Sequence, residues 1–227
     1  MNSLKIVFMG SPDFAVPSLD ALYNSHHQIL AVASNPDKRR GRRSRPEPTD
    51  VKKRAIELGL HVIDVADVKS EQFEAELMQL DPDLLVVVAF RILPDNILSV
   101  PKLGSINLHA SLLPKYRGAA PIHHAVMQGE KETGCTVFFL DKKVDTGEII
   151  GQVKTAVGPN ETTGDVYDRL KKLGADLLLQ SVQEIADGSA QRLPQNHEAA
   201  TPAPKLFSEN THIDFTRTST DIHNFIR

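Results

Sequence analysis

Short apolar runs alternate with amphipathic stretches along most of the chain, which is the pattern of an α/β protein. The runs are continuous rather than alternating, as is typical of strands in a parallel sheet that is covered on both faces. They predict strands at Leu4–Met9, Gln28–Ser34, His61–Val65, Leu84–Ala89 and Ser105–His109. Apolar residues at helical spacing predict helices at Phe14–Tyr23, Val51–Leu58, Glu71–Leu80, Ala119–Gln128 and Thr163–Ala186.

The pattern changes in the second half of the chain. Thr133–Leu140 and Glu148–Val157 are two runs joined by a turn, which predicts an antiparallel edge on a mixed sheet. Gln191–Lys205 is rich in proline, alanine and polar residues and is expected to be a connecting stretch. The expected architecture is α/β and Rossmann-like, with a mixed, mainly parallel sheet and helices on both faces.

Composition excludes several classes of protein. Of 227 residues, 41% are hydrophobic and 24% charged, which is ordinary for a globular domain and excludes fibrous, disordered and disulfide-rich classes. No apolar run approaches the roughly 18 residues of a membrane span. The single cysteine, Cys135, cannot form an internal disulfide, so a cytoplasmic location is expected.

The net charge of −3 conceals one strongly basic segment. Between Lys38 and Arg54, nine basic residues stand against Glu47 and Asp50, which leaves 17 of the 26 basic and 27 of the 29 acidic residues for the rest of the chain. Such a cluster is either a solvated loop or an arm that contacts the phosphates of a nucleic acid. Its prolines and Gly41 exclude a regular helix, so we expect a loop.

Two familiar kinds of site are disfavoured. The turn after the first strand begins with Gly10, but Pro12 and Ala15 replace the second and third glycines of a dinucleotide fingerprint, which argues against a nicotinamide or flavin oxidoreductase. The pairs His26-His27 and His123-His124 lack cysteine or carboxylate companions at ligand spacing, which argues against a metal site.

Asn107, His109 and Asp145 are the candidate chemical groups. If Ser105–His109 is a strand, Asn107 and His109 project to the same face near its carboxyl end, where open α/β sheets place ligands. An amide can donate to an oxygen that gains negative charge, and a histidine can carry a proton near neutral pH. Asp145 is either an ordinary turn residue or a carboxylate that orients His109. A buried polar cluster without catalytic function is the alternative for the first two.

The segment from Ser111 to Gly118 is expected to be a loop that leads into a helix. Its two leucines, Leu112 and Leu113, are expected either to be exposed as an apolar binding wall or to anchor the loop.

Four short motifs, each weak alone, become specific in combination. They are Asn107-x-His109-x-Ser111-Leu112-Leu113-Pro114, Tyr116-Arg117-Gly118-Ala119-Ala120-Pro121-Ile122, Glu132-Thr133-Gly134-x-Thr136 and Asp145-Thr146-Gly147. Together they resemble the folate-dependent formyltransferases, from about Lys5 to the end of the chain. The resemblance implies an enzyme in which Asn107, His109 and Asp145 are catalytic, with 10-formyltetrahydrofolate as formyl donor and no metal. It also implies a folate site along Phe90, Arg91, Ile92, Leu93, Ser111, Leu112, Leu113 and Pro114.

Within that family the chain is most similar to members that formylate methionyl-initiator tRNA, although Arg91 stands where they often carry glycine. Those members insert a basic loop into the tRNA acceptor arm, which implies tRNA contacts for Lys38, Arg39, Arg40, Arg42, Arg43 and Arg45. They also continue into a carboxyl-terminal β-barrel. We therefore expect a catalytic domain at 1–205, a linker at 206–227 toward a barrel absent from this chain, initiator tRNA and folate as partners, no membrane, and a monomer.

Two alternatives stay open. One is a formyltransferase that acts on another amine, such as glycinamide ribonucleotide or an amino sugar. The other is a nucleic-acid-binding α/β module without catalysis.

Overall fold

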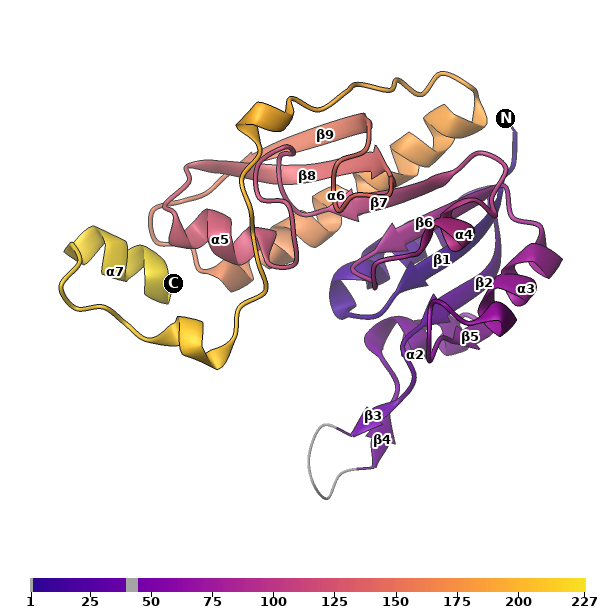
Figure 1. The fold of residues 1–227 in the computed structure, drawn as a ribbon, viewed down its shortest axis with the longest axis horizontal. Coiled ribbons are helices and arrows are strands. Elements are labelled where there is room, and N and C mark those ends of the chain that lie inside the picture. Colours follow the sequence, from indigo (N-terminus) through magenta and orange to yellow (C-terminus); the bar gives the residue numbers. More distant parts are fainter. Residues whose placement is uncertain (1, 40–44) are drawn as a thin grey trace.

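A seven-stranded mixed sheet forms the centre of the molecule (Figure 1), and the computed structural model describes residues 2–39 and 45–227. The strand order is β5-β2-β1-β6-β7-β8-β9. The parallel strands are β1 (Lys5–Gly10), β2 (Gln28–Ser34), β5 (Val62–Asp64), β6 (Leu84–Val88) and β7 (Ser105–His109). The strands β8 (Glu132–Phe139) and β9 (Ile149–Ala156) add the antiparallel edge. The predicted fold class and antiparallel edge are confirmed.

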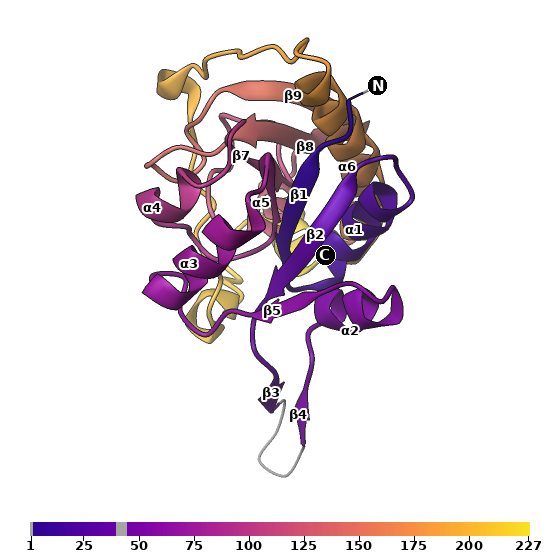
Figure 2. The same cartoon turned by 90° about the vertical axis from the view of Figure 1, so that its right-hand side faces the viewer.

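Helices cover both faces of this sheet (Figures 1 and 2). One face carries α1 (Val16–Tyr23), α2 (Asp50–Glu57), α5 (Pro121–Met127) and α6 (Thr163–Ala186), which share one apolar core with the sheet. The other face carries α3 (Glu71–Leu80) and α4 (Asp95–Leu98) over a second core. Strand β6 is apolar throughout, and β1 is apolar after the exposed Lys5, because each of their faces lies in one of these cores.

The parallel strands end level with one another at one edge of the sheet. Gly10 of β1 pairs with Val88 of β6, and Val88 pairs with Leu108 of β7. A short 3-10 helix, η1 (Asp13–Ala15), follows β1, and irregular loops follow β6 and β7 at the same edge. This carboxyl edge is where open α/β sheets bind ligands.

The basic segment forms a narrow ribbon that projects from the body beyond β2 (Figure 2). Its strands β3 (Lys38–Arg39) and β4 (Pro46–Glu47) pair antiparallel, and residues 40–44 lie outside the described part of the chain. At its base, the Lys52 ammonium contacts the carboxylates of Asp37 at 2.6 Å and Asp64 at 2.8 Å. These ion pairs tie both ends of the ribbon to the sheet.

After α6 the chain crosses back along the molecule toward α5 (Figure 1). This stretch contains the short 3-10 helices η2 (His197–Ala199) and η3 (Ser208–Thr211) and ends with α7 (Ser219–Ile226), which packs against α5. The segment 206–227, predicted as a linker, thus contains one 3-10 helix and one α-helix. No described helix is long and apolar enough to cross a membrane.

Candidate functional site

Asn107 and His109 lie two residues apart at the carboxyl end of β7, so their side chains project to one face of the strand. Strand β7 is held between β6 and β8, which fixes its backbone on both sides. His109 is buried, with 6% exposure, whereas Asn107 is half-buried. The sheet therefore presents an amide and an imidazole side by side at the edge where ligands bind.

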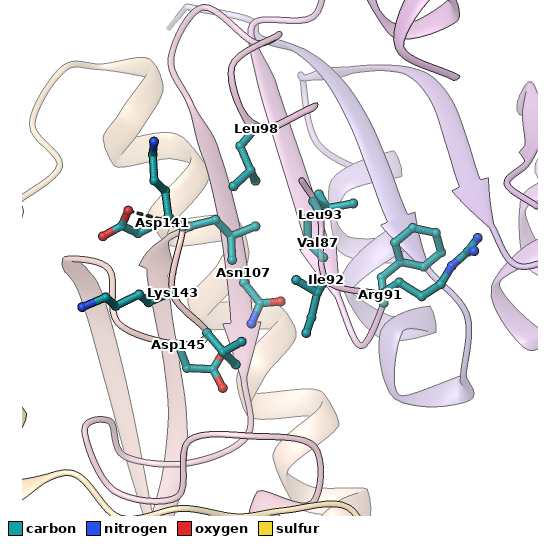
Figure 3. Close-up of a pocket in the computed structure, with 13 residues that line it drawn as sticks. Val87, Arg91, Ile92, Leu93, Leu98, Asn107, Asp141, Lys143 and Asp145 are labelled. Carbon is teal, nitrogen blue, oxygen red and sulfur yellow. Dashed lines mark hydrogen bonds between the residues drawn. The ribbon is translucent and has the colours of Figure 1, made fainter. Parts of the chain in front are cut away.

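A pocket of about 100 Å³ opens beside Asn107 (Figure 3). Asn107 and Asp145 point into the same space, from β7 and from the loop between β8 and β9. Among the described residues, the Asn107 amide has no hydrogen-bonding partner, so its N–H groups are free to donate to a bound molecule. The lining residues are Val87, Phe90, Arg91, Ile92, Leu93, Leu98, Asn107, Leu140, Asp141, Lys142, Lys143, Val144 and Asp145.

The His109 ring is held between two segments. Its Nε2 lies 2.8 Å from the Tyr116 carbonyl oxygen. A carbonyl only accepts, so this contact places a proton on Nε2. On the other side, Nδ1 lies 3.8 Å from Asp145 Oδ2, which is within ion-pair range but longer than a hydrogen bond. His109 and Asp145 are therefore neighbours without a direct hydrogen bond.

The loop that carries Asp145 is held by one hydrogen bond of the carboxylate and by a close approach of its backbone to β8. Asp145 has a left-handed φ of +53°, and its carboxylate accepts a 2.8 Å hydrogen bond from the Gly118 N–H. Two residues on, a Cβ at Gly147 would lie 1.8 Å from the Phe139 carbonyl oxygen, so only glycine fits there. The motif Asp145-Thr146-Gly147 thus combines a close backbone approach with a buried carboxylate.

Backbone strain gathers around these groups. Ala89 (φ +49°) follows β6 directly, and Tyr116 (φ +62°) is the residue whose carbonyl binds His109. With Asp145, they are three of the four non-glycine residues with positive φ in the described chain, the other being Asp81. Left-handed backbone costs energy in a residue such as tyrosine, and such residues concentrate at functional sites.

The loop after β7 is held by the Thr136 hydroxyl. It donates to the Ser111 carbonyl at 2.7 Å and accepts from the Leu113 N–H at 3.1 Å. The Gln152 amide, 2.9 Å from both the Thr136 hydroxyl and the Leu113 carbonyl, completes this network. Leu113 is buried against Phe138, so of the two alternatives for the leucines, Leu113 follows the second and anchors the loop.

Arg91 contributes to the lining of the pocket, but its guanidinium points away from it (Figure 3). Its guanidinium donates to the carbonyl oxygens of Val65 and Ala66 and fixes the loop after β6 to the loop after β5. Meanwhile the backbone N–H and C=O groups of residues 90–93 make no hydrogen bond with any other described residue. Beside the pocket they remain available to a ligand.

Comparison with known proteins identifies the family of this chain. The profile described as "Formyl transferase" matches residues 4–182. The chain belongs to the formyl transferase family. It is 49% identical to methionyl-tRNA formyltransferase of Chlorobium luteolum and 48% identical to that of Pelotomaculum thermopropionicum, covering 99% of this chain and 72% of each relative. It also resembles the crystal structure of an N-formyltransferase from Helicobacter canadensis in complex with folinic acid and dTDP-3-aminofucose (TM-score 0.77, 26% identity), covering 99% of this chain and 80% of that one.

The sequence-predicted residues occupy three places in this formyl transferase. Residues 90–93 line the same pocket as Asn107 and Asp145, and His109 lies directly behind Asp145. Residues 111–114 follow His109 but do not line that pocket. Lys38, Arg39 and Arg45 are exposed on the ribbon, whereas Arg40, Arg42 and Arg43 lie outside the described residues.

Sequence reasoning missed the buried Gln195 beside the site. Gln195 lies in the stretch predicted to be a mere connection, yet it is 7% exposed and hydrogen-bonded to the backbone of the Asp145 loop. No local pattern marks it, because it stands alone in a polar, irregular segment. Its role appears only when the chain is folded.

The histidine pairs do not assemble a metal site in the described residues, which contain no group of three or more histidine, cysteine or acidic side chains that could hold an ion. The buried His27 accepts a hydrogen bond from the Leu4 N–H, and the His124 ring contacts the Pro204 carbonyl. Both rings therefore have structural contacts.

Proposed function

We propose that this formyl transferase moves the formyl group of 10-formyltetrahydrofolate to the α-amine of methionine esterified to initiator tRNA, for the initiation of translation. The amine nitrogen forms a bond to the formyl carbon, and the bond from that carbon to the folate nitrogen breaks. The proton lost by the amine ends on that folate nitrogen. The relatives named methionyl-tRNA formyltransferase support this acceptor, since they are nearly half identical over almost the whole chain.

The observation that carries the chemistry is the common pocket of Asn107 and Asp145, with His109 behind it. As the amine attacks, negative charge develops on the formyl oxygen, and donors preorganised at that point lower the barrier. The free amide of Asn107 is such a donor. The transfer needs no covalent intermediate, so no nucleophile is required beside it.

Asp145 and His109 together handle the proton. The Tyr116 carbonyl keeps a proton on Nε2 of His109, so Nδ1 is the position where the ring gains or loses one. That nitrogen faces the Asp145 carboxylate, which in turn faces the pocket. In the proposed reaction the carboxylate accepts the proton of the attacking amine and delivers it to the folate nitrogen as the bond between that nitrogen and the formyl carbon breaks, with the adjacent Nδ1 of His109 holding the proton in between.

The folate is proposed to lie along residues 90–93, with the loop 111–114 beside it. Two observations support this placement. The backbone groups of residues 90–93 have no partner in the described chain, and a pterin ring is rich in complementary donors and acceptors. The structurally similar N-formyltransferase from Helicobacter canadensis is a complex with folinic acid, a folate.

The basic ribbon is proposed to contact the tRNA. Lys38, Arg39 and Arg45 are exposed on it, and it leaves the sheet after β2, at the same carboxyl edge as the pocket. A tRNA held there by its phosphates can reach the pocket with its aminoacyl end. Contacts of this kind release counterions, so affinity falls as salt rises.

A product assay tests the acceptor. The protein is incubated with 10-formyltetrahydrofolate and, separately, with methionyl-initiator tRNA, glycinamide ribonucleotide or a nucleotide-linked amino sugar, and products are identified by mass spectrometry. We expect formylmethionyl-tRNA alone. Formylation of either small amine in place of the tRNA would refute the assignment, and tRNA binding without any formylation would favour the non-catalytic module.

Asp145→Asn tests the chemistry. The amide can still accept from the Gly118 N–H, so the fold is retained, but the charge beside His109 is lost. We expect turnover to fall by about 10²- to 10⁴-fold. Asp141→Asn is the matched control, because Asp141 lines the same pocket from the same loop. Turnover of Asp145→Asn equal to that of the control would remove Asp145 from the mechanism.

The ribbon is tested by replacing Lys38, Arg39 and Arg45 with alanine. We expect KM for the tRNA to rise and its dependence on salt to flatten, because each lost phosphate contact lowers the salt slope by about 1. A triple variant of exposed lysines elsewhere, Lys102, Lys154 and Lys172, serves as the control. An unchanged salt slope in the ribbon variant would show that the described ribbon does not bind the tRNA.

A further inference from the structure

Backbone hydrogen bonds attach the stretch after α6 to two segments near His109, the loop at Arg117 and the start of β9. Leu193 pairs through its backbone with Ile149, at the start of β9. Further along, Pro202 forms a bridge with Arg117, and the Arg117 N–H donates to the Thr201 carbonyl at 2.8 Å. Between these two attachments the chain buries a single glutamine, Gln195.

The Gln195 amide joins two loops that are far apart in sequence. Its Nε2 donates to the carbonyl oxygens of Asp145 at 3.0 Å and Gly147 at 2.8 Å. Its Oε1 accepts from the Arg117 guanidinium at 2.6 Å. A guanidinium only donates and carbonyls only accept, so the amide fits in one orientation alone. Glutamine is the uncharged side chain of this length that supplies both functions.

The residues that Gln195 contacts are next to those that contact His109 and Asp145. Arg117 precedes Gly118, whose N–H donates to the Asp145 carboxylate, and it follows Tyr116, whose carbonyl binds His109. One side of the histidine is therefore held by residues 116–118 and the other by residue 145. Besides the Gly118–Asp145 hydrogen bond, the Gln195 side chain is a second link between those two segments.

We infer that Gln195 is a positioning residue for formyl transfer, which holds the Asp145 carboxylate at its position beside His109 and the pocket. The inference rests on the proposed function, because it gives Gln195 a role only if Asp145 and His109 act in the reaction. Without the amide, the left-handed Asp145 loop loses both of its backbone hydrogen bonds to Gln195. A displacement of the carboxylate by about 1 Å is enough to slow a reaction by roughly 10²-fold.

The test compares Gln195→Ala and Gln195→Glu with Leu193→Ala. Glutamate keeps the size of the side chain and the contact with Arg117 but cannot donate to the two carbonyls, so it tests the same bonds without a cavity. Leu193 is the matched control, because it lies in the same stretch with an exposed side chain. Melting curves identify variants that remain folded.

We expect both Gln195 variants to lower kcat by about 10- to 100-fold while KM for 10-formyltetrahydrofolate changes less than threefold. We also expect the ¹⁵N shifts of the His109 ring to move in NMR spectra of the free protein. The control should leave both unchanged.

A folded Gln195→Glu protein with kcat within twofold of wild type and unmoved His109 shifts would overturn the inference. That result is separable from failure of the proposed function. The latter is decided by the product assay and by Asp145→Asn, in proteins that keep Gln195 intact.

Discussion

Thr136→Val removes one buried hydroxyl and changes the shape of the side chain little. Thr136 has no exposed surface, and its hydroxyl contacts the Ser111 carbonyl, the Leu113 N–H and the Gln152 amide. In the variant, the Ser111 carbonyl loses its donor and the Leu113 N–H loses its acceptor, whereas Gln152 keeps its bond to the Leu113 carbonyl. Two buried backbone groups are therefore left without partners.

The cost follows from those two groups. Each buried polar group without a partner costs about 1–3 kcal/mol, and the added methyl group returns about 1 kcal/mol. We expect the free energy of unfolding to fall by about 2–4 kcal/mol, measured by urea denaturation. The Leu113 amide should also exchange its hydrogen faster than in the wild type, because it is no longer bonded.

Thr133→Val is the matched control. Thr133 is also buried in β8, but its hydroxyl makes no hydrogen bond with any other described residue. Its replacement should leave stability unchanged or raise it. If Thr136→Val and Thr133→Val unfold within about 0.5 kcal/mol of each other, the hydroxyl does not hold the loop after β7.

Two further predictions concern buried titratable groups. Burial and the neighbouring His26 lower the pKa of His27, so the unfolded chain binds a proton at this ring at a higher pH than the folded protein does. The free energy of unfolding should therefore fall as the pH drops from 8 to 5, and His27→Gln should reduce that loss. The same pH dependence in the variant and the wild type, measured by urea denaturation, would contradict the prediction. Burial raises the pKa of Cys135 to about 12, so a thiol reagent at pH 8 should label the unfolded protein only, and rapid labelling of the native protein would contradict this.

Elements with a strong local pattern could be predicted from the sequence. The bounds of β2, β7, α3 and α6 match the predicted ranges, because their apolar residues are numerous and periodic. The helix α6 also carries its own start signal, since Thr162 and Asp165 form a capping box. In these segments the local sequence pattern favours the same helix or strand that the folded protein contains.

The missed elements lack that pattern. The helix α4 has only four residues after Pro94, and α7 lies in a polar segment with few apolar residues to bury. In the ribbon, β3 and β4 contribute two residues each, all exposed, so no alternation of apolar and polar residues signals a strand. At the base of the ribbon, Lys52 binds Asp37 and Asp64.

The candidate site divides in the same way. Asn107 and His109 could be placed on one face from the strand period alone. The approach of Asp145 could not be derived from spacing, because it depends on how the hairpin of β8 and β9 folds back beside β7. Gln195 is far from its partners in the sequence, and these partners lie in two separate loops, at Arg117 and at Asp145. No sequence pattern links the three positions.

The proposed reacting groups are therefore held by residues that take no part in the chemistry. Tyr116 and Asp145 adopt left-handed backbone that would relax in an isolated loop, and each is fixed from outside. Tyr116 is held through the Thr201 hydroxyl, which accepts its N–H at 2.9 Å, and Asp145 through Gln195. Both supports come from the stretch after α6. That stretch therefore belongs to the site as much as the motif residues do, because it fixes both loops that flank the His109 ring.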